Sequence, residues 1–326
     1  MMKVQRRTAG LWLAGLSMAR AFPALAQGTY PNRKIRLIVP YPPGGSSDAT
    51  ARLVAQRLQS LLGQTVVVDN QGGASGIIGT LAAARAAPDG YTLMFSTSTN
   101  HVIAPLLRQP QPYDPVKDFT PIAPFVIYDG AIVVNSALPV ATVSELIAYS
   151  KAHPKMLNYS SAGIGSTNHL ATEQFKAQTG ADLVHVPYKG GAASTLAVAS
   201  NEVQVTIDVV SSALPLAKAG RVRLLAVNTP TRSPLAPEVP TFAEAGVKDI
   251  ANYWQGLSGP AHMSKDIVAL LNRATTQVME TPEMKSKLAD VGATVVSGSA
   301  ESFAESIAKE TANWTEVIRV NGIKAE

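Results

Sequence analysis

Short apolar runs alternate with helical patterns along most of the chain, and this alternation constrains the fold more than any other feature. The runs are rich in β-branched residues and are bounded by Pro, Gly, Asn or Ser, which is typical of buried strands. They cover residues 35–39, 66–68, 93–95, 131–134, 183–186, 203–207 and 224–227. Strands that alternate with helices predict parallel sheets that are covered by helices on both faces.

The helical patterns carry several end signals. Between the first two runs, apolar residues at helical spacing predict a helix that is capped by Ser46, Ser47 or Asp48 and closed by Gly63. From about residue 267 the chain is mainly helical, and we expect its last helix to pack across a domain. We interpret Trp254 as a core or hinge anchor.

The first 26 residues have the three-part pattern of a secretory signal peptide. Lys3, Arg6 and Arg7 precede a short apolar stretch at residues 11–19, and Ala24-Leu25-Ala26 is a small-x-small cleavage site. This apolar stretch is too short to cross a bilayer, which takes about 20 residues. We therefore expect export and cleavage near Ala26 rather than membrane anchoring.

Removal of this segment changes the charge. The chain has 28 Lys+Arg against 23 Asp+Glu, and four of the basic residues but no acidic residue lie in residues 1–26. The remainder has a net charge of +1, which gives no support to nucleic-acid binding. The chain has no cysteine, which excludes disulfides, Cys-ligated metal, thiol catalysis and an N-terminal lipidated cysteine.

Three polar loops each follow a predicted strand and open a predicted helix, at residues 41–48, 96–100 and 160–168. Their glycines let the backbone approach a ligand, and free amides at a helix N-terminus favour negative charge. Serine and threonine hydroxyls add further donors. None of the loops contains arginine, so an anion would be bound by dipoles and hydrogen bonds. One such loop could be a capped turn only, but three together predict an anion site.

Nucleotide and enzyme motifs are absent. The 41–48 loop lacks the Gly-Lys-Ser/Thr of a phosphate-binding loop, and Gly73, Gly76 and Gly79 are not spaced as a dinucleotide fingerprint. We interpret these glycines as a tight turn into a closely packed helix. No G-x-S-x-G elbow and no H-x-x-x-H pair occurs. We therefore expect no catalytic residue, metal or cofactor.

Three further side chains have two open interpretations each. His169 could contact a ligand or support its loop. Tyr188 could stack on a ligand or donate a hydrogen bond to it, or could cover the sheet edge. Asp208 could orient a polar or cationic ligand group, or cap Ser211 and Ser212.

Long motifs follow one another in a fixed order, at residues 30–31, 40–52, 68–70, 88–93, 118–122, 157–170, 186–190, 240–246 and 254–257. Together they span essentially the whole chain after residue 26. They resemble the Bug family, the solute receptors of tripartite tricarboxylate transporters. One departure is residues 71–75, Gln-Gly-Gly-Ala-Ser, which we expect to form a packing loop.

The resemblance implies a type II periplasmic binding protein fold, with two doubly wound α/β domains joined by crossover segments. Residues 27–125 and 251–326 would form the first domain, and residues 126–250 the second. The implied protein is a periplasmic monomer without a membrane anchor. It would bind a carboxylate and deliver it to a two-subunit membrane permease.

In that family, backbone amides and hydroxyls of two loops hold the ligand carboxylate. Carried onto this chain, the first loop supplies Tyr41, Gly44, Gly45, Ser46, Ser47 and Asp48, and the second supplies Ala162, Gly163, Gly165, Ser166 and Thr167. Ser98, Tyr188 and Asp208 would select the ligand, and His169 completes the set of candidate residues.

Three functional hypotheses follow. The first is a transport receptor for an organic carboxylate. The second is a receptor that binds the same ligand and docks on a sensor kinase. The third is a secreted hydrolase built on one of the many serines.

Overall fold

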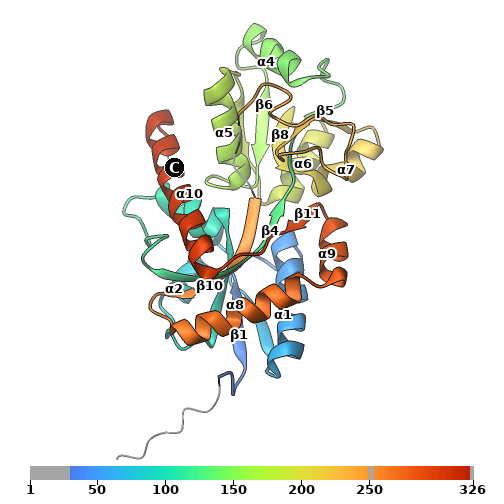
Figure 1. Cartoon of the computed structure of the whole chain (residues 1–326). Coiled ribbons are helices and arrows are strands. Elements are labelled where there is room, and N and C mark those ends of the chain that lie inside the picture. Colours follow the sequence, from blue (N-terminus) through green and yellow to red (C-terminus); the bar gives the residue numbers. More distant parts are fainter. Residues whose placement is uncertain (1–29, 249, 251–252, 324–326) are drawn as a thin grey trace, which may run out of the picture.

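The computed structural model describes residues 30–248, 250 and 253–323. The predicted signal peptide, residues 1–26, lies outside the described residues. The chain forms two lobes, each built around one β-sheet (Figure 1). Among the described residues, no helix combines the length and the apolar character that a bilayer crossing requires.

The first lobe contains a six-stranded sheet in the order β11-β4-β10-β3-β1-β2. Its strands are β1 (Ile35–Val39), β2 (Val66–Asn70), β3 (Thr92–Thr97), β4 (Phe119–Tyr128), β10 (Tyr253–Pro260) and β11 (Ala293–Val295). Its helical elements are α1 (Ser46–Leu62), η1 (Ala74–Gly76), α2 (Ile77–Ala84), η2 (Ser98–Ile103), α3 (Ala104–Leu106), α8 (Lys265–Met279), α9 (Pro282–Ala289) and α10 (Ala300–Asn321).

The second lobe contains a five-stranded sheet in the order β7-β6-β8-β5-β9. Its strands are β5 (Gly130–Asn135), β6 (Asn158–Ser161), β7 (Val184–Pro187), β8 (Val205–Val209) and β9 (Val222–Val227). Its helices are α4 (Val143–Ala152), α5 (Thr167–Thr179), α6 (Gly191–Ala199) and α7 (Val210–Lys218).

The two sheets follow the same rule. In each, three parallel strands lie side by side, in the order β2-β1-β3 in one sheet and β7-β6-β8 in the other. The next strand arrives from the other lobe, and it is β10 in the first sheet and β5 in the second. These two strands are antiparallel to their neighbours. The prediction of parallel sheets is therefore right for β1–β3 and β6–β8 and wrong for the arriving strands, because no crossover helix turns the chain before they pair.

Alternation along the strands supplies two cores per lobe. Leu37 and Val39 of β1 face the cluster that α1 and α8 cover, whereas Ile38 faces α2 on the opposite side of the sheet. In the second lobe, Ile132 faces α4 and α5, and Val133 faces α6 and α7. Both sheets are thus covered on both faces, as predicted.

Helix ends match the sequence signals in part. Gly63 closes α1 in the left-handed conformation, with φ 65°, as predicted. The N-cap of α1 is Gly45, however, and none of Ser46, Ser47 and Asp48 caps the helix. The Asp48 carboxylate instead reaches back and accepts a hydrogen bond from the Gly44 N–H.

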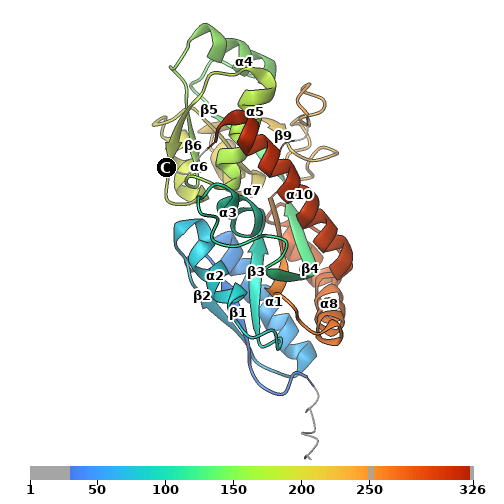
Figure 2. The same ribbon diagram turned by 90° about the vertical axis from the view of Figure 1, so that its left-hand side faces the viewer.

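Helix α10 runs along both lobes (Figure 2). Its Phe303, Ile307 and Trp314 pack in one cluster with Val102 of η2 and Leu170 of α5. The last helix thus packs across the first lobe, as predicted, and also reaches α5 of the second lobe.

Candidate functional site

The three predicted loops follow β1, β3 and β6, and the structure brings the second and third into direct contact across the lobes. Ser98 Oγ lies 3.0 Å from Thr167 Oγ1, and Thr99 Oγ1 lies 2.7 Å from the same atom. Thr99 Oγ1 also accepts a hydrogen bond from the Thr167 N–H. Hydroxyls of the first lobe therefore meet the N-terminus of α5.

The 71–75 segment also reaches the second lobe. Ser75 Oγ donates a hydrogen bond of 3.1 Å to the Ile164 carbonyl. Gly79 packs as expected, since a Cβ there would lie 2.6 Å from the Gln71 carbonyl oxygen. The prediction of a packing loop is thus incomplete, because the serine that departs from the family pattern also makes an interlobe hydrogen bond.

The 41–48 loop is anchored through charge. The Asp48 carboxylate is buried and accepts hydrogen bonds from Gly44 N, Arg52 Nε and Asn70 Nδ2 at 2.9–3.0 Å. The Arg52 hydrogen bond, with those from Gly44 and Asn70, lowers the pKa of Asp48 to about 2. An arginine therefore supports this loop, from one helical turn beyond residues 41–48.

The loop itself is open. Gly44, Gly45 and Ser46 are exposed, and Gly45 caps α1 without a side-chain hydrogen bond. Among the described residues, the amides of Ser46 and Ser47 have no hydrogen-bond acceptor. These amides stand at the positive end of a helix dipole, which favours an anion.

Tyr41 connects the first loop to the end of β3. Its Oη lies 2.7 Å from Thr97 Oγ1, and burial raises the pKa of Tyr41 to about 12. Asn100 Oδ1 accepts from the Thr97 N–H, while the Asn100 N–H donates to Thr97 Oγ1, which closes the start of η2. Tyr41 thus stays protonated in a rigid setting.

The 160–168 loop is anchored through neutral groups. Ser166 caps α5 by accepting from the His169 N–H, and the Gly165 N–H donates to His169 Nδ1 at 3.2 Å. Gly163 and Gly165 have φ of 124° and 78°, values that favour glycine. Of the two interpretations of His169, the geometry shows the support of its loop.

The Asp208 carboxylate is hydrogen-bonded within the second lobe. Asp208 Oδ2 accepts from Thr195 Oγ1 at 2.8 Å, and Oδ1 accepts from the Val209 N–H, so Asp208 does not cap Ser211 or Ser212. Burial raises the pKa of Asp208.

Tyr188 packs beside the cluster under α6 and α7, and its hydroxyl is buried without a hydrogen-bond partner among the described residues. Burial, followed by the Glu202 carboxylate, raises the pKa of Tyr188 to about 12. The hydroxyl therefore stays protonated and able to donate.

A serine–histidine pair does occur, but it is closed to a substrate. His185 Nε2 lies 2.7 Å from Ser161 Oγ, while Ser161 is fully buried and also bonds to the Gly163 backbone. The part of the chain that the structure describes holds no group of three His, Asp or Glu side chains placed to ligate a metal. Sequence reasoning missed Thr99, Ser75 and His185, because their roles depend on contacts between distant segments.

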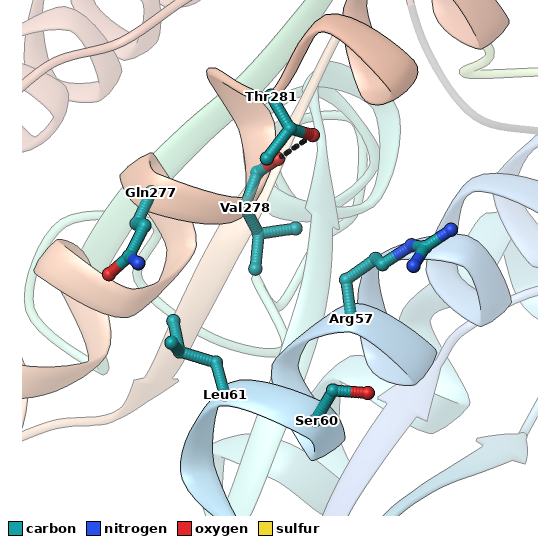
Figure 3. A pocket seen from close by; sticks show the side chains of 6 residues that line it. All are labelled: Arg57, Ser60, Leu61, Gln277, Val278 and Thr281. Carbon is teal, nitrogen blue, oxygen red and sulfur yellow. Dashed lines mark hydrogen bonds between the residues drawn. The ribbon is translucent and has the colours of Figure 1, made fainter.

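Two cavities lie away from these loops. One, of about 240 Å³, is a surface pocket between α1 and α8 lined by Arg57, Ser60, Leu61, Gln277, Val278 and Thr281 (Figure 3). The other, of about 590 Å³, lies against α10 and is lined by residues including Trp254, Phe303, Glu310 and Trp314. None of the candidate site residues lines either cavity.

The second cavity is lined by side chains of β4, β10 and α10, among others. Trp254 meets Phe303 edge to face at 5.3 Å, and the indoles of Trp254 and Trp314 donate to the Glu310 carboxylate. Burial raises the pKa of Glu310 to about 7, although the two indole donors oppose the shift. Trp254 is thus an anchor between the arriving strand β10 and α10, as predicted.

Comparisons with known proteins agree with this architecture. Residues 50–323 match the family described as tripartite tricarboxylate transporter family receptor. Protein BugT of Bordetella pertussis is 35% identical over 317 residues, which cover 97% of this chain and 96% of that protein.

Two solved structures extend the comparison. R. palustris Rpa4515 with adipate is 36% identical, with a TM-score of 0.83 over 90% of this chain and 99% of that chain. MatC (Rpa3494) from Rhodopseudomonas palustris with bound malate is 29% identical, with a TM-score of 0.80 over 89% and 100%. The two-domain periplasmic binding protein fold is thereby confirmed. The chain belongs to the tripartite tricarboxylate transporter receptor family, which is the family that its sequence motifs resemble.

Proposed function

We propose that the protein is a periplasmic receptor that captures a carboxylate-bearing organic anion between its two lobes and delivers it to a tripartite tricarboxylate-type membrane permease. The observation that carries the proposal is the convergence of the Ser98–Thr99 and Ala162–Thr167 segments across the lobes, beside the open N-terminus of α1. Related proteins with adipate and with malate support the ligand class.

The ligand carboxylate is bound by neutral donors. The amides of Gly45, Ser46 and Ser47 supply one side, together with the Tyr41 hydroxyl, while the Gly44 amide holds Asp48. The other side is supplied by residues of the second loop: Ala162, Gly163, Gly165, Ser166 and Thr167. Hydrogen bonds from amides and hydroxyls at helix N-termini stabilise an anion without a buried ion pair, which suits reversible capture. Asp48 acts here by holding the first loop, and His169 by holding the second.

Selection among carboxylates falls to Ser98, Tyr188 and Asp208. Ser98 is already within hydrogen-bond distance of Thr167, so a ligand hydroxyl or second carboxylate competes with that contact. Asp208 lies against Gly191 at the start of α6, and the Tyr188 hydroxyl is buried without a partner among the described residues. A ligand that leaves the Tyr188 hydroxyl without a partner is disfavoured, since such a group costs about 1–3 kcal/mol.

Capture is coupled to closure of the lobes. Each lobe moves as one unit, with β1–β4 and β10–α10 in the first and β5–β9 in the second, and only the closed state brings both sets of donors to one anion. The ligand therefore shifts the population toward the closed form, which the permease recognises.

A thermal-shift screen against dicarboxylates, tricarboxylates and aromatic carboxylates tests the ligand class, with the protein purified from the periplasm of the expressing cells. A true ligand at 100 times its Kd stabilises the folded state by about 2.7 kcal/mol, which gives a clear rise in Tm. The diamides of the same acids are the controls and should give no shift. If no carboxylate raises the Tm, the proposal is wrong.

Delivery is tested separately in cells. Uptake of the labelled carboxylate should require both the receptor and the permease genes. If the receptor binds the carboxylate but uptake persists without the receptor, the protein senses the ligand rather than transports it.

A further inference from the structure

The imidazoles of buried His169 and partly buried His185 stack beneath the second ligand loop. The rings of His169 on α5 and His185 on β7 lie 4.1 Å apart at an angle of 17°. His185 also stacks on Tyr159 of β6, at 4.8 Å. His169 is 6% exposed. The stack therefore joins three elements of the lobe under one loop.

The hydrogen bonds around the stack define where the protons must be. His169 Nδ1 accepts from the Gly165 N–H, so Nδ1 carries no proton and the neutral ring is protonated at Nε2. Ser161 Oγ accepts from the Gly163 N–H and donates to the Gly163 carbonyl. Because the single Ser161 proton is used in this way, His185 Nε2 donates to Ser161 Oγ. Both rings, in their neutral forms, thus hold the backbone of Gly163 and Gly165.

We propose that His169 and His185 are positioning residues, a neutral stacked pair that sets the backbone of the second ligand loop, and that a proton taken up by the pair releases this backbone and weakens anion capture. The effect on capture rests on the proposed function of the loop. The effect on the loop itself does not.

The charges around the pair act on its protonation in both directions. A proton on His169 must enter at Nδ1, where it faces the Gly165 N–H and the positive end of the α5 dipole. Lys176 on α5 also disfavours the cation, whereas Glu173 favours it. Glu173 is already engaged by the Tyr159 hydroxyl at 2.6 Å and by Lys176 Nζ at 2.7 Å.

Burial is the largest cause in both rings. It lowers the pKa of His169, and burial followed by the neighbouring His169 lowers the pKa of His185 to about 4. Two cations 4.1 Å apart are mutually excluded, so the pair takes up one proton at a time. A proton on His169 breaks the hydrogen bond from the Gly165 N–H, and the charge on His169 then lowers the pKa of His185.

The direct test follows the Gly165 amide by ¹⁵N NMR in the full mature protein between about pH 7.5 and pH 4.5. In the wild type, the Gly165 resonance should move with the titration of His169, below the usual histidine range. His169→Asn places an uncharged acceptor near the Nδ1 position, so its Gly165 resonance should stay fixed. His262→Asn is the matched control, because His262 is exposed and its φ of 66° suits asparagine, and it should titrate like the wild type.

A second arm measures capture, with adipate as the probe. From about pH 7.5 to pH 5, the ratio of the wild-type Kd to the His169→Asn Kd should rise about tenfold, the equivalent of one lost hydrogen bond. Protonation of adipate itself cancels in this ratio. His185→Gln, which keeps a donor near Nε2, should lie between the two.

The outcomes separate the two proposals. A Gly165 resonance that ignores pH in the wild type, or that moves equally in His169→Asn, overturns the positioning role. If Gly165 titrates as expected and adipate, malate and the rest of the carboxylate panel fail to bind at any pH, the proposed function fails while the positioning role stands. A pH-independent Kd ratio with a titrating Gly165 overturns the link between the pair and capture.

Discussion

The two lobes present similar loops that are held in opposite ways. The first-lobe loop is exposed, and its anchor is the buried Asp48 carboxylate with Arg52 and Asn70. The second-lobe loop is largely buried, and its anchors are the Ser166 cap and the neutral His169 ring. The first arrangement leaves the Ser46 and Ser47 amides of α1 open to an anion, whereas the Thr167 and His169 amides of α5 already have acceptors. The first anchor depends on a charge, and the second depends on the absence of one.

This difference predicts different responses to acid. The pKa of Asp48 is lowered to about 2, so its contribution is present above its unfolded pKa of about 4 and is lost as the pH falls through about 2. The pKa values of His169 and His185 are also lowered, so the unfolded state takes up protons first. Their contribution is complete above about pH 6.5 and declines as the pH falls below it. The second loop should therefore fail first.

The largest expected effect is on the charged anchor. Asp48→Ala removes the acceptor of three hydrogen bonds and leaves the Gly44 N–H and Asn70 without it, so the free energy of unfolding should fall by about 3 kcal/mol. Urea denaturation measures this change. Asp290→Ala, at an exposed helix end, should change it by less than about 0.5 kcal/mol. If the two variants lower the free energy of unfolding equally, Asp48 does not anchor the loop.

A Gly→Ala substitution in each loop compares how tightly the two loop backbones are constrained. At Gly165, φ is 78° and a Cβ would lie 2.9 Å from Leu107 Cδ1, so Gly165→Ala should cost about 2 kcal/mol. At Gly44, φ is 91° but nothing lies within 4 Å, so Gly44→Ala should cost about 1 kcal/mol of backbone strain alone. Thermal denaturation of the pair tests the order, and a reversed order would show that the second loop is the looser one.

An intermediate effect is expected at the contact between lobes. Thr167→Val leaves the Ser98 and Thr99 hydroxyls without their shared partner and should cost about 1 kcal/mol. The unliganded protein should also become more open by small-angle scattering. Thr179→Val removes a hydrogen bond within α5 and one from the Ala181 N–H, both inside the second lobe, and as the control it should leave the shape unchanged.

The smallest expected effect is the pH dependence of stability. Between about pH 7 and pH 5.5, the free energy of unfolding should decline by less than about 1 kcal/mol through the histidine pair, and His169→Asn should flatten the profile. Glu310 should change the free energy of unfolding in the opposite direction as the pH falls. Its pKa is raised to about 7, so its contribution is complete below about pH 4.5 and is lost as the pH rises through about 7. Glu310→Gln in the same background separates the two groups, and an unchanged profile in His169→Asn would contradict the neutral anchor.

The pattern of apolar runs predicted much of the fold. The predicted runs did not include β4 or β10, and both omissions have physical causes. The β4 strand contains Pro121 and Pro124, which normally argue against a strand, but they oppose the register shifts of β10 at Ser258 and Gly256. The β10 strand shows no alternation because it is buried between neighbours. At Gly256 a Cβ would lie 2.6 Å from the Phe303 ring.

The site was predictable as loops but not as contacts. The Gly, Ser and Thr residues that follow the strands located all three loops, because a turn into a helix N-terminus favours such residues locally. The meeting of Thr167 with Ser98 and Thr99 depends on how two lobes close, and His185 lies within a strand where nothing local distinguishes it. Local chemistry is readable from sequence, whereas partners across a lobe boundary are not.

The most direct test of the central claim is a crystal structure with the carboxylate that gives the largest thermal shift. The account predicts carboxylate oxygens within hydrogen-bond distance of amides or hydroxyls from both the 41–48 loop and the 162–167 loop. A ligand bound elsewhere, in the cavity against α10 or on one lobe alone, would contradict it.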